Sequence, residues 1–310
     1  MQMQDSRAPA LPRRGSSWSL RAWVMASRPH TLMIGVNPVL VGCALAWAET
    51  GRIDVTLMVL SMLGALLLQT GTNLDNDVSD FERGTDRAGR LGLPRATALG
   101  LLTPGQVRSA SRACFLVATA IGLVLAWHGG WPILVAGIAS AAAAMAYSGG
   151  PRPISYTPFG DFVVWLFFGL VAVTGTYYLQ TLAVSAGVLV AATMVGLPAA
   201  AVLVVNNYRD LDPDRIVGKR TLAVCLGREF TRWQYAVLVL APFALLPVLG
   251  LQTRIGLTLL VPLLALPAAI GLVRRFWRET PGPAFNPVLA HTARFQVLFS
   301  ALLCVAILLA

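Results

Sequence analysis

Long apolar runs without charge are the feature that most constrains the fold of this chain. Between Asp161 and Asp210 the only charged residue is Arg209, and runs of similar character recur along most of the sequence. An apolar run of about twenty residues is long enough to cross a bilayer as a helix. Only 12% of the 310 residues are charged, whereas soluble domains carry about 25%. The sequence therefore predicts a polytopic membrane protein.

Each spanning segment must be a helix, because backbone polar groups find no water inside lipid. We therefore expect an all-α fold with about nine transmembrane helices. The expected spans are residues 29–48, 55–79, 107–127, 131–148, 160–181, 184–209, 232–250, 254–273 and 287–309. Residues 1–22 are polar and predict a disordered cytoplasmic tail, which leaves residues 23–310 as a single transmembrane domain.

Basic residues are distributed unevenly between the loops. The amino-terminal tail and the loops after the second, fourth, sixth and eighth spans hold nearly all of them, and the other side has only Arg52 and Arg254. Positively charged loops stay in the cytoplasm, so we expect a protein of the cell (inner) membrane with a cytoplasmic amino terminus. The net charge of +10 follows from this topology and does not indicate nucleic-acid binding.

Acidic residues gather at the ends of two apolar runs. Of the fourteen in the chain, five lie within residues 75–86 and three within residues 210–214. With the asparagine that precedes each, the two motifs are Asn73, Asp77 and Asp80 and, later, Asn206, Asp210 and Asp214. Residues four apart share one face of a helix. Because Pro213 disfavours helix at the residue before it, Asp214 is expected to hang from the helix end.

Both motifs end even-numbered spans, so they open on the same side of the membrane and can face one another.

This pair of motifs suggests a metal and phosphate chemistry. Carboxylates on apolar helices are costly and indicate function. Facing oxygen ligands suit Mg²⁺, which usually takes one or two carboxylates and completes its shell with water and substrate phosphate oxygens. Basic loops follow the motifs at residues 81–106 and 209–231, and their Arg and Lys side chains suit phosphate. The combination predicts an amphipathic substrate with a diphosphate head and a lipid tail, whose leaving group Mg²⁺ would neutralise.

Other interpretations fit parts of the same pattern. Asp and Asn at a helix end can simply cap it, but two motifs of matching spacing, each before a basic loop, favour a site. A secondary transporter could use the acids for a coupling ion, although transporters place such residues near the bilayer midplane. An inactive lipid-binding scaffold is a third alternative, against which the intact acids argue.

The two motifs resemble the paired aspartate motifs of the UbiA superfamily of intramembrane prenyltransferases. Within it, the stretches Arg28-Pro-His-Thr-Leu, Tyr147-Ser-Gly-Gly-Pro and Gly218-Lys-Arg-Thr-Leu are similar to the branch that prenylates 1,4-dihydroxy-2-naphthoate. The resemblance runs from about Trp23 to the carboxyl terminus. It implies nine helices around a central cavity with a lateral opening to lipid.

The resemblance also implies substrates and roles. A polyprenyl diphosphate would alkylate 1,4-dihydroxy-2-naphthoate with loss of CO₂, giving demethylmenaquinone for menaquinone biosynthesis; another aromatic or lipid acceptor is the alternative. The implied Mg²⁺ ligands are Asp77, Asp80, Asp210 and Asp214. The implied diphosphate contacts are Lys219, Arg220, Arg28 and Arg152. Asn73 and Asn206 would support ligands or substrate, and Tyr147 would stand near the reaction centre.

A few further residues have two interpretations. Asp161 either caps the fifth span or acts in catalysis, and Tyr156 and Asn37 are weaker site candidates. Aromatic side chains of the fifth span either shield an allylic cation or pack and anchor the helix at the interface. They are Trp165, Phe167, Phe168, Tyr177 and Tyr178, of which the two tyrosines are expected to be interfacial.

Overall fold

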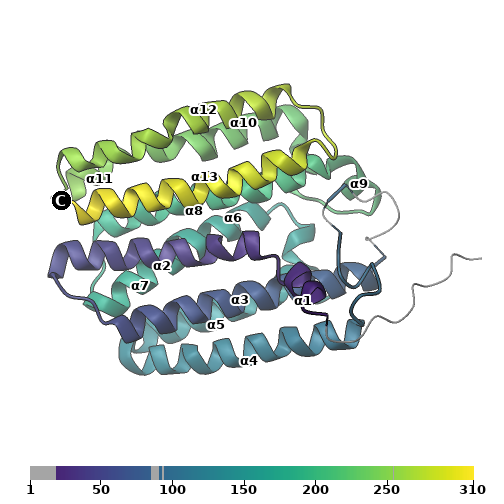
Figure 1. Ribbon diagram of the computed structural model, residues 1–310, viewed down its shortest axis with the longest axis horizontal. Coiled ribbons are helices and arrows are strands. Elements are labelled where there is room, and N and C mark those ends of the chain that lie inside the picture. Colours follow the sequence, from purple (N-terminus) through teal and green to yellow (C-terminus); the bar gives the residue numbers. More distant parts are fainter. Residues whose placement is uncertain (1–18, 85–90, 93, 254) are drawn as a thin grey trace, which may run out of the picture.

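The computed structural model describes residues 19–84, 91–92, 94–253 and 255–310, and this part of the chain is helical without a β-strand. Its long helices lie nearly parallel to one another (Figure 1). Nine of the described segments are long and apolar enough to cross a membrane, which confirms the expected all-α, nine-span architecture. Helix α1 (Leu20–Ser27) begins inside the expected tail, and residues 1–18 lie outside the described part.

The spans follow the expected order with small differences at their ends. They are α2 (Pro29–Thr50), α3 (Val55–Glu82), α4 (Pro104–Gly129), α5 (Trp131–Ser148), the run α6 (Gly160–Val164), η2 (Trp165–Val171) and α7 (Ala172–Thr181), then α8 (Ala186–Arg209), α10 (Leu222–Ala244) with α11 (Leu246–Gln252), η3 (Leu257–Ala265) with α12 (Leu266–Arg278), and α13 (Phe285–Leu308). Helix α10 starts ten residues before the expected 232, where Thr221 caps it through a 3.3 Å bond from the Val224 amide, and it is kinked at Gly227, whose backbone is not helical (φ 81°). The expected span starts later because Arg228 and Glu229 follow this kink and interrupt the apolar run.

The sixth span ends at Arg209 as expected, but the chain after it differs from the expectation. Helix α8 stops at Arg209, Asp210 leaves helical geometry, and the short helix α9 (Leu211–Ile216) follows at once. Pro213 lies in the first turn of α9, where a missing amide proton costs nothing. The break therefore falls at Asp210, and Asp214 lies one turn into a new helix instead of hanging from the old one.

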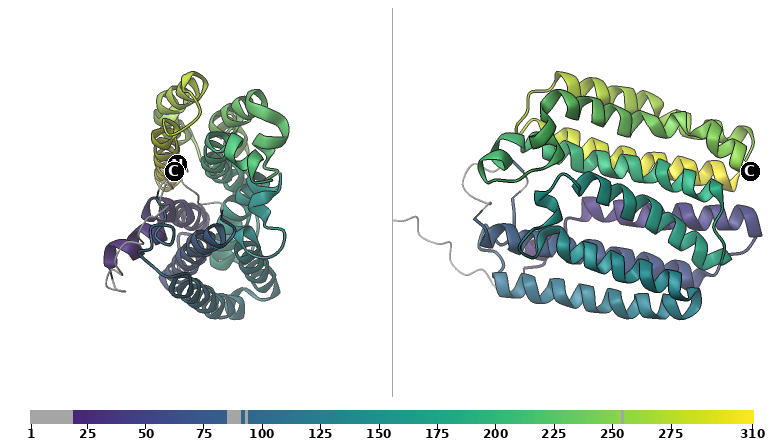
Figure 2. Two further views of the ribbon diagram at one scale, coloured as in Figure 1. Left: turned by 90° about the vertical axis from the view of Figure 1, so that its right-hand side faces the viewer. Right: turned by 180° about the vertical axis from the view of Figure 1, so that it is seen from behind.

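Two groups of helices make up the bundle. The end-on view in Figure 2 has the amino-terminal helices on one side and α10 to α12 on the other. Helix α13 returns to pack on both α2 and α8. Helix α8 is the most enclosed element, and buried side chains such as Val195 and Val204 join it to α10 and α13 in the main core.

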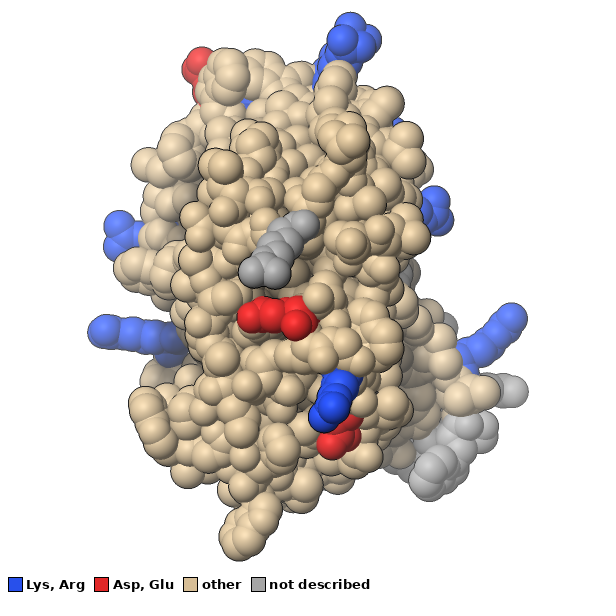
Figure 3. Space-filling view, turned by 90° about the vertical axis from the view of Figure 1, so that its left-hand side faces the viewer, with Lys and Arg blue, Asp and Glu red and all other residues tan. Residues whose placement is uncertain are grey.

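Apolar side chains cover the outside of the bundle. Trp127 at the end of α4 is 94% exposed, and Leu116 on the same helix is 71% exposed. Exposed apolar area on this scale is not stable in water, and lipid is the solvent that accommodates it. The molecular end opposite α9 shows few charged side chains (Figure 3).

A close contact between two glycines joins the fifth and sixth spans. A Cβ atom on Gly196 of α8 would come within 2.7 Å of the Trp165 carbonyl oxygen, and one on Gly169 would come within 2.6 Å of the Ala192 carbonyl oxygen. The π-helical segment η2 carries Gly169 at this crossing. These glycines let two backbones touch, and small residues are the usual means by which membrane helices approach closely.

Gly196→Ala is expected to lower stability by about 1–3 kcal/mol, the cost typical of overpacking, and to lower the melting temperature in detergent. Gly271→Ala in α12 is the matched control, because a Cβ there meets nothing within 4 Å. It should be neutral or slightly stabilising, since alanine is the better helix former. Equal melting temperatures for the two variants would contradict a tight α8–η2 contact.

Candidate functional site

A large cavity opens beside the two acid motifs. Its volume is about 1010 Å³, and its lining comes from α1 to α8, the 209–219 segment and α13. Helices α10 and α12 contribute no lining residue, so two of the nine expected spans stand outside the cavity wall. Asp80 and Asn73 line it from α3, and Asp210 and Asn206 line it from α8 and its end. The motifs therefore do face one another across one cavity.

The first motif occupies the last turns of α3. Leu74 and Val78 on one side of these turns pack against α1 and the 96–107 segment, which turns Asn73, Asn76 and Asp80 toward the cavity. Asn73 Nδ2 donates to the Ser27 carbonyl at 2.9 Å and to Thr31 Oγ1 at 3.0 Å. Asn73 thus fixes the junction of α1 and α2, where Arg28 adopts a left-handed conformation with φ 51° and lines the cavity.

The second motif is organised by Arg209. Its guanidinium donates to both carboxylate oxygens of Asp210, at 2.8 Å from Nε and 2.5 Å from Nη2. Nη2 also donates to Asn206 Oδ1 at 2.7 Å. The arginine is 3% exposed, so one buried cation orients both polar residues. Charge-assisted, two-pronged bonds of this kind are the strongest that a carboxylate accepts.

Each lining carboxylate has a basic partner. Arg95 Nη2 lies 2.5 Å from Asp80 Oδ2, and Lys219 Nζ lies 3.0 Å from Asp214 Oδ1. Burial raises the pKa of Asp214, Lys219 opposes the rise, and the carboxylates of Asp210 and Asp80 add to it. Because Asp80 belongs to the first motif, this mutual influence means that the two motifs lie within electrostatic range of each other.

Asp77 is the exception among the motif acids. It is 1% exposed, does not line the cavity, and its Oδ1 is buried without a hydrogen-bond partner. Such an oxygen is costly unless a donor or cation satisfies it. A hard cation fits carboxylate oxygens, so the α3 end can accept one. Within the described ranges, no three His, Cys, Asp or Glu side chains form a ready metal cluster, because the acids divide between two helices and pair with cations.

Tyr156 is not a lining residue of the cavity, but its ring contacts two basic residues near the acid motifs, one of which, Lys219, lines the cavity. Lys219 Nζ lies 5.1 Å from its ring centroid and Arg83 Cζ lies 5.3 Å from it. Arg83 also donates to the Ser148 and Gly150 carbonyls at 2.6 and 2.8 Å. The Arg220 amide donates to the Tyr156 carbonyl at 2.9 Å. Through its ring and its main-chain carbonyl, Tyr156 thereby connects three parts of the chain: the end of α3, the segment between α5 and α6, and the segment after α9.

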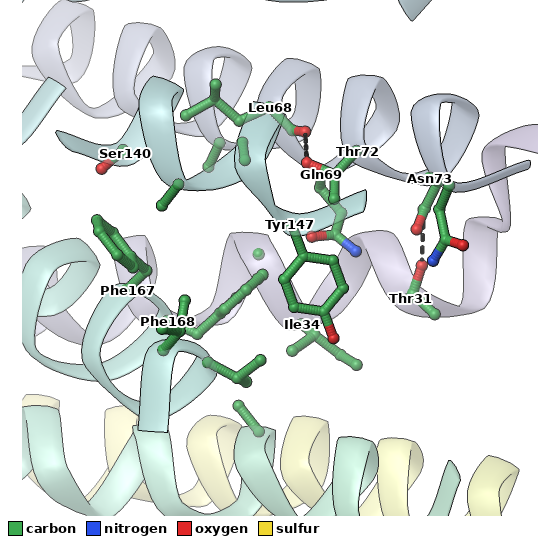
Figure 4. Close-up of a pocket in the computed structure, with 18 of the residues that line it drawn as sticks. Thr31, Ile34, Leu68, Gln69, Thr72, Asn73, Ser140, Tyr147, Phe167 and Phe168 are labelled. Carbon is green, nitrogen blue, oxygen red and sulfur yellow. Dashed lines mark hydrogen bonds between the residues drawn. The ribbon is translucent and has the colours of Figure 1, made fainter. Parts of the chain in front are cut away.

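The interior of the cavity changes from polar to apolar away from the motifs. Figure 4 shows the Tyr147 ring near Gln69 and Ile34, with Thr31 and Asn73 toward the polar end. Phe167 and Phe168 lie farther along in the opposite direction. These two aromatic side chains line the cavity, whereas Trp165 does not. Tyr177 is buried at the end of the bundle away from the acid motifs, where its hydroxyl donates to Glu49. The cavity can therefore hold a molecule with a charged head and an apolar tail.

Several sequence candidates lie outside the cavity lining. Arg152 and Arg220 are exposed and are not lining residues. Asn37 bonds Gln296 of α13 at 3.0 Å, which is a contact between packed helices. Asp161 accepts from Asn207 at 3.1 Å and from Gln234 at 2.8 Å, so it joins α6, α8 and α10 behind the wall and makes no cap bond. Asp86, Arg87 and Arg90 of the first basic loop fall outside the described residues.

Sequence reasoning missed three residues that organise the site: Arg95, Arg209 and Asn286. A lone cation directly before Asp210, in a run with no other charge, was the available signal for Arg209. Arg95 was one of several loop arginines, and nothing local separated it from the rest. Asn286 had no signal, because its partners Arg209 and Leu91 are 77 and 195 residues away in the chain.

Comparison with known proteins agrees with this geometry. The sequence profile described as the UbiA prenyltransferase family matches residues 36–309. The 1,4-dihydroxy-2-naphthoate octaprenyltransferase of Escherichia coli (strain K12) is 33% identical over 93% of this chain and 96% of its own length. The protein of the same name from Mycobacterium leprae (strain TN) is 36% identical over 94% of this chain and 98% of its own length.

A solved structure has the same fold. A UbiA homolog from Archaeoglobus fulgidus, bound to DMAPP and Mg²⁺, superposes with a TM-score of 0.67 at 17% identity, covering 93% of this chain and 99% of that one. With the paired aspartate motifs on one cavity, and a family profile that spans most of the sequence, the chain belongs to the UbiA prenyltransferase family.

Proposed function

We propose that this protein transfers a polyprenyl group from a polyprenyl diphosphate to 1,4-dihydroxy-2-naphthoate, with loss of CO₂, to give demethylmenaquinol, the two-electron-reduced form of demethylmenaquinone. The observation that carries the proposal is the convergence of both acid motifs on one end of a cavity whose remaining lining is mostly apolar. The naphthoate acceptor is supported by the bacterial relatives, which match over nearly their whole length.

Mg²⁺ is the metal that suits this head-group end. The part of the cavity that a diphosphate would enter is lined by three carboxylates, those of Asp80, Asp210 and Asp214. The carboxylates and the diphosphate are all anions, which repel one another unless a cation lies between them. The unpartnered oxygen of Asp77 supplies a further ligand. Asp77, Asp80, Asp210 and Asp214 would hold the ion, whose charge would make the diphosphate a better leaving group. The archaeal homologue of the same fold is bound to Mg²⁺ and DMAPP.

The chain's own residues would orient the two substrates. Lys219 and Arg28, which both line the cavity, would bind diphosphate oxygens, with exposed Arg220 and Arg152 in an outer position. The allylic C1–O bond would break with its electron pair leaving on the diphosphate. The electron-rich ring carbon of the acceptor would then form the new C–C bond, and the ring carboxylate would leave as CO₂. Phe167, Phe168 and Tyr147 would shield the allylic cation from water.

Asn73 and Asn206 would act by orientation. Asn73 holds the junction that carries Arg28, and Asn206 shares Arg209 with Asp210. With the basic ends of the spans inside, the cavity mouth and the amino terminus would face the cytoplasm of the cell (inner) membrane, where water-soluble 1,4-dihydroxy-2-naphthoate is available.

The test is a transfer assay on the whole protein in nanodiscs. It uses 1,4-dihydroxy-2-naphthoate and a labelled polyprenyl diphosphate, with Mg²⁺ or with EDTA. A CO₂-releasing, Mg²⁺-dependent prenylated naphthoate is expected. Diphosphate release without a naphthoate product would indicate another aromatic or lipid acceptor. Folded protein that neither turns over nor binds the diphosphate would overturn the proposal in favour of a transporter.

Tyr156→Leu is expected to raise the KM for the polyprenyl diphosphate about fivefold or more, because two cation–π contacts of about 0.5–1 kcal/mol each are removed. Lys219 and Arg83 would lose the ring between them, while kcat changes less. Tyr156→Phe keeps the ring and should stay near the wild-type KM. A phenylalanine variant as poor as the leucine variant would shift the role to the hydroxyl group.

A further inference from the structure

Asn286 lies where three separate parts of the chain meet. It belongs to the first turn of α13 and does not line the cavity. Its Oδ1 accepts from Arg209 Nη1 at 2.8 Å, and its Nδ2 donates to the Leu91 carbonyl at 3.0 Å. Both functional groups of one side chain are therefore used, each toward a different half of the site.

The Arg209 contact leads directly to the second motif. The same guanidinium binds both oxygens of Asp210 and the side chain of Asn206. Asn286 occupies Nη1, the remaining edge of that guanidinium, and so limits its rotation. A buried arginine with all its edges engaged holds its carboxylate in one position.

The Leu91 contact leads to the first motif. Leu91, Pro94 and Arg95 line the cavity. Arg95 lies 2.5 Å from Asp80 and donates to the Asn76 carbonyl at 2.6 Å. The Leu91 carbonyl that Asn286 binds lies four residues before this arginine in the chain.

The position of Asn286 is itself rigid. The neighbouring Phe285 is fully buried, with its ring 5.1 Å from that of Tyr208 and 5.2 Å from that of Phe276. Tyr208 directly precedes Arg209 in α8. The start of α13 is thus anchored to the same turn of α8 that carries the second motif, and Asn286 extends that anchor to the 91–95 segment.

We propose that Asn286 is a positioning residue that holds the two acid motifs in register, so that a metal-bridged diphosphate can contact both at once. This inference rests on the proposed function. A site split between two helices must keep its ligands within a fraction of an ångström, and supporting hydrogen bonds outside the ligand shell provide that precision. Removing this link should weaken diphosphate and Mg²⁺ binding more than it lowers the rate at saturation.

Asn286→Leu is the first variant, because leucine has a similar size and makes neither bond. The expected result is an increase of about tenfold in the KM for a polyprenyl diphosphate and in the half-saturating Mg²⁺ concentration, with a smaller change in kcat. Gln180→Leu is the matched control. Gln180 likewise uses both groups of its side-chain amide, in bonds of 2.8 and 3.0 Å to the backbone of Asp54, but at the opposite end of the bundle. Gln180→Leu should keep wild-type kinetics.

Hydrogen exchange of the substrate-free protein provides a readout independent of turnover. In Asn286→Leu, the amides of residues 91, 92 and 95 and those in residues 209–214 should exchange about tenfold faster, whereas Gln180→Leu should leave them unchanged. Asn286→Asp keeps the acceptor for Arg209 and loses the donor to Leu91, so only residues 91, 92 and 95 should speed up. An aspartate is also favourable in the first turn of a helix, which protects folding.

The outcomes separate the two proposals. Wild-type KM and Mg²⁺ dependence in folded Asn286→Leu would overturn the positioning role even if exchange increased. Acceleration in only one of the two segments of Asn286→Leu would overturn the link between the motifs. If the wild-type protein transfers no prenyl group, the proposed function fails. The link between the motifs is then judged by exchange alone: faster exchange of both segments in Asn286→Leu would establish it, and unchanged exchange would remove it.

Discussion

Asp77→Asn is expected to reduce prenyl transfer by at least about a hundredfold to a thousandfold, the loss typical when one preorganised electrostatic group is removed from an active site. Asp77 is nearly inaccessible, and one of its carboxylate oxygens has no partner. Asparagine has the same shape but no charge, so it removes the strongest cation ligand at the end of α3. Folding should be unchanged or slightly improved, because a buried charge without a partner is itself destabilising.

Initial rates against Mg²⁺ concentration, together with the melting temperature, measure this prediction. Asp54→Asn is the matched control at the other end of the same helix. Asp54 caps α3 through a 3.0 Å bond from the Leu57 amide, and asparagine caps about as well as aspartate. Full activity in Asp77→Asn would remove Asp77 from the metal site and leave the other three carboxylates to hold the ion.

The fold was largely predictable from the sequence because membrane spans are a local property. Twenty apolar residues specify a helix wherever they occur, so the number and order of spans followed from composition alone. The α10 start escaped prediction because its first turn lies before the kink at Gly227, and the charged residues Arg228 and Glu229 separate it from the long apolar run. The π-helical η2 segment and its glycine contact with α8 also escaped, since they depend on how two helices cross.

The site was predictable only in part, for a related reason. Spacing and the apolar context together identify Asn206 and Asp210, which both line the cavity although Asp210 follows the last residue of α8. Spacing cannot report that Asp80 is held by Arg95, or that Asp210 is held by Arg209, because a charge pair depends on tertiary distance. Asn37 shows the opposite error. It is polar within a span, which suggested a site, but its partner is Gln296 on the neighbouring helix.

Arg209→Leu is expected to destabilise the protein by about 3–5 kcal/mol, the cost of breaking a buried ion pair by removing one member. The Arg209 side chain is 2% exposed and lies 2.5 Å from Asp210, so the carboxylate would lose its cation in a poorly hydrated place. Activity should fall by about a hundredfold, since a shift of about 1 Å in a positioned group has an effect of that size. Arg209→Lys keeps the charge without the planar fork and should be intermediate.

The neighbouring pair of Arg228 and Asp212 provides the control. These side chains lie 2.7 Å apart but are 33% and 67% exposed, and exposed pairs contribute about 0–1 kcal/mol. Arg228→Leu should therefore change the melting temperature and the rate only slightly, although it too removes one arginine charge, from α10 instead of α8. If Arg209→Leu lowered the melting temperature but kept the wild-type KM and Mg²⁺ dependence, Arg209 would stabilise the α8 end without orienting Asp210 for the reaction. A loss in both, restored in part by lysine, would mean that the cation holding the second motif also sets the geometry in which the diphosphate is bound.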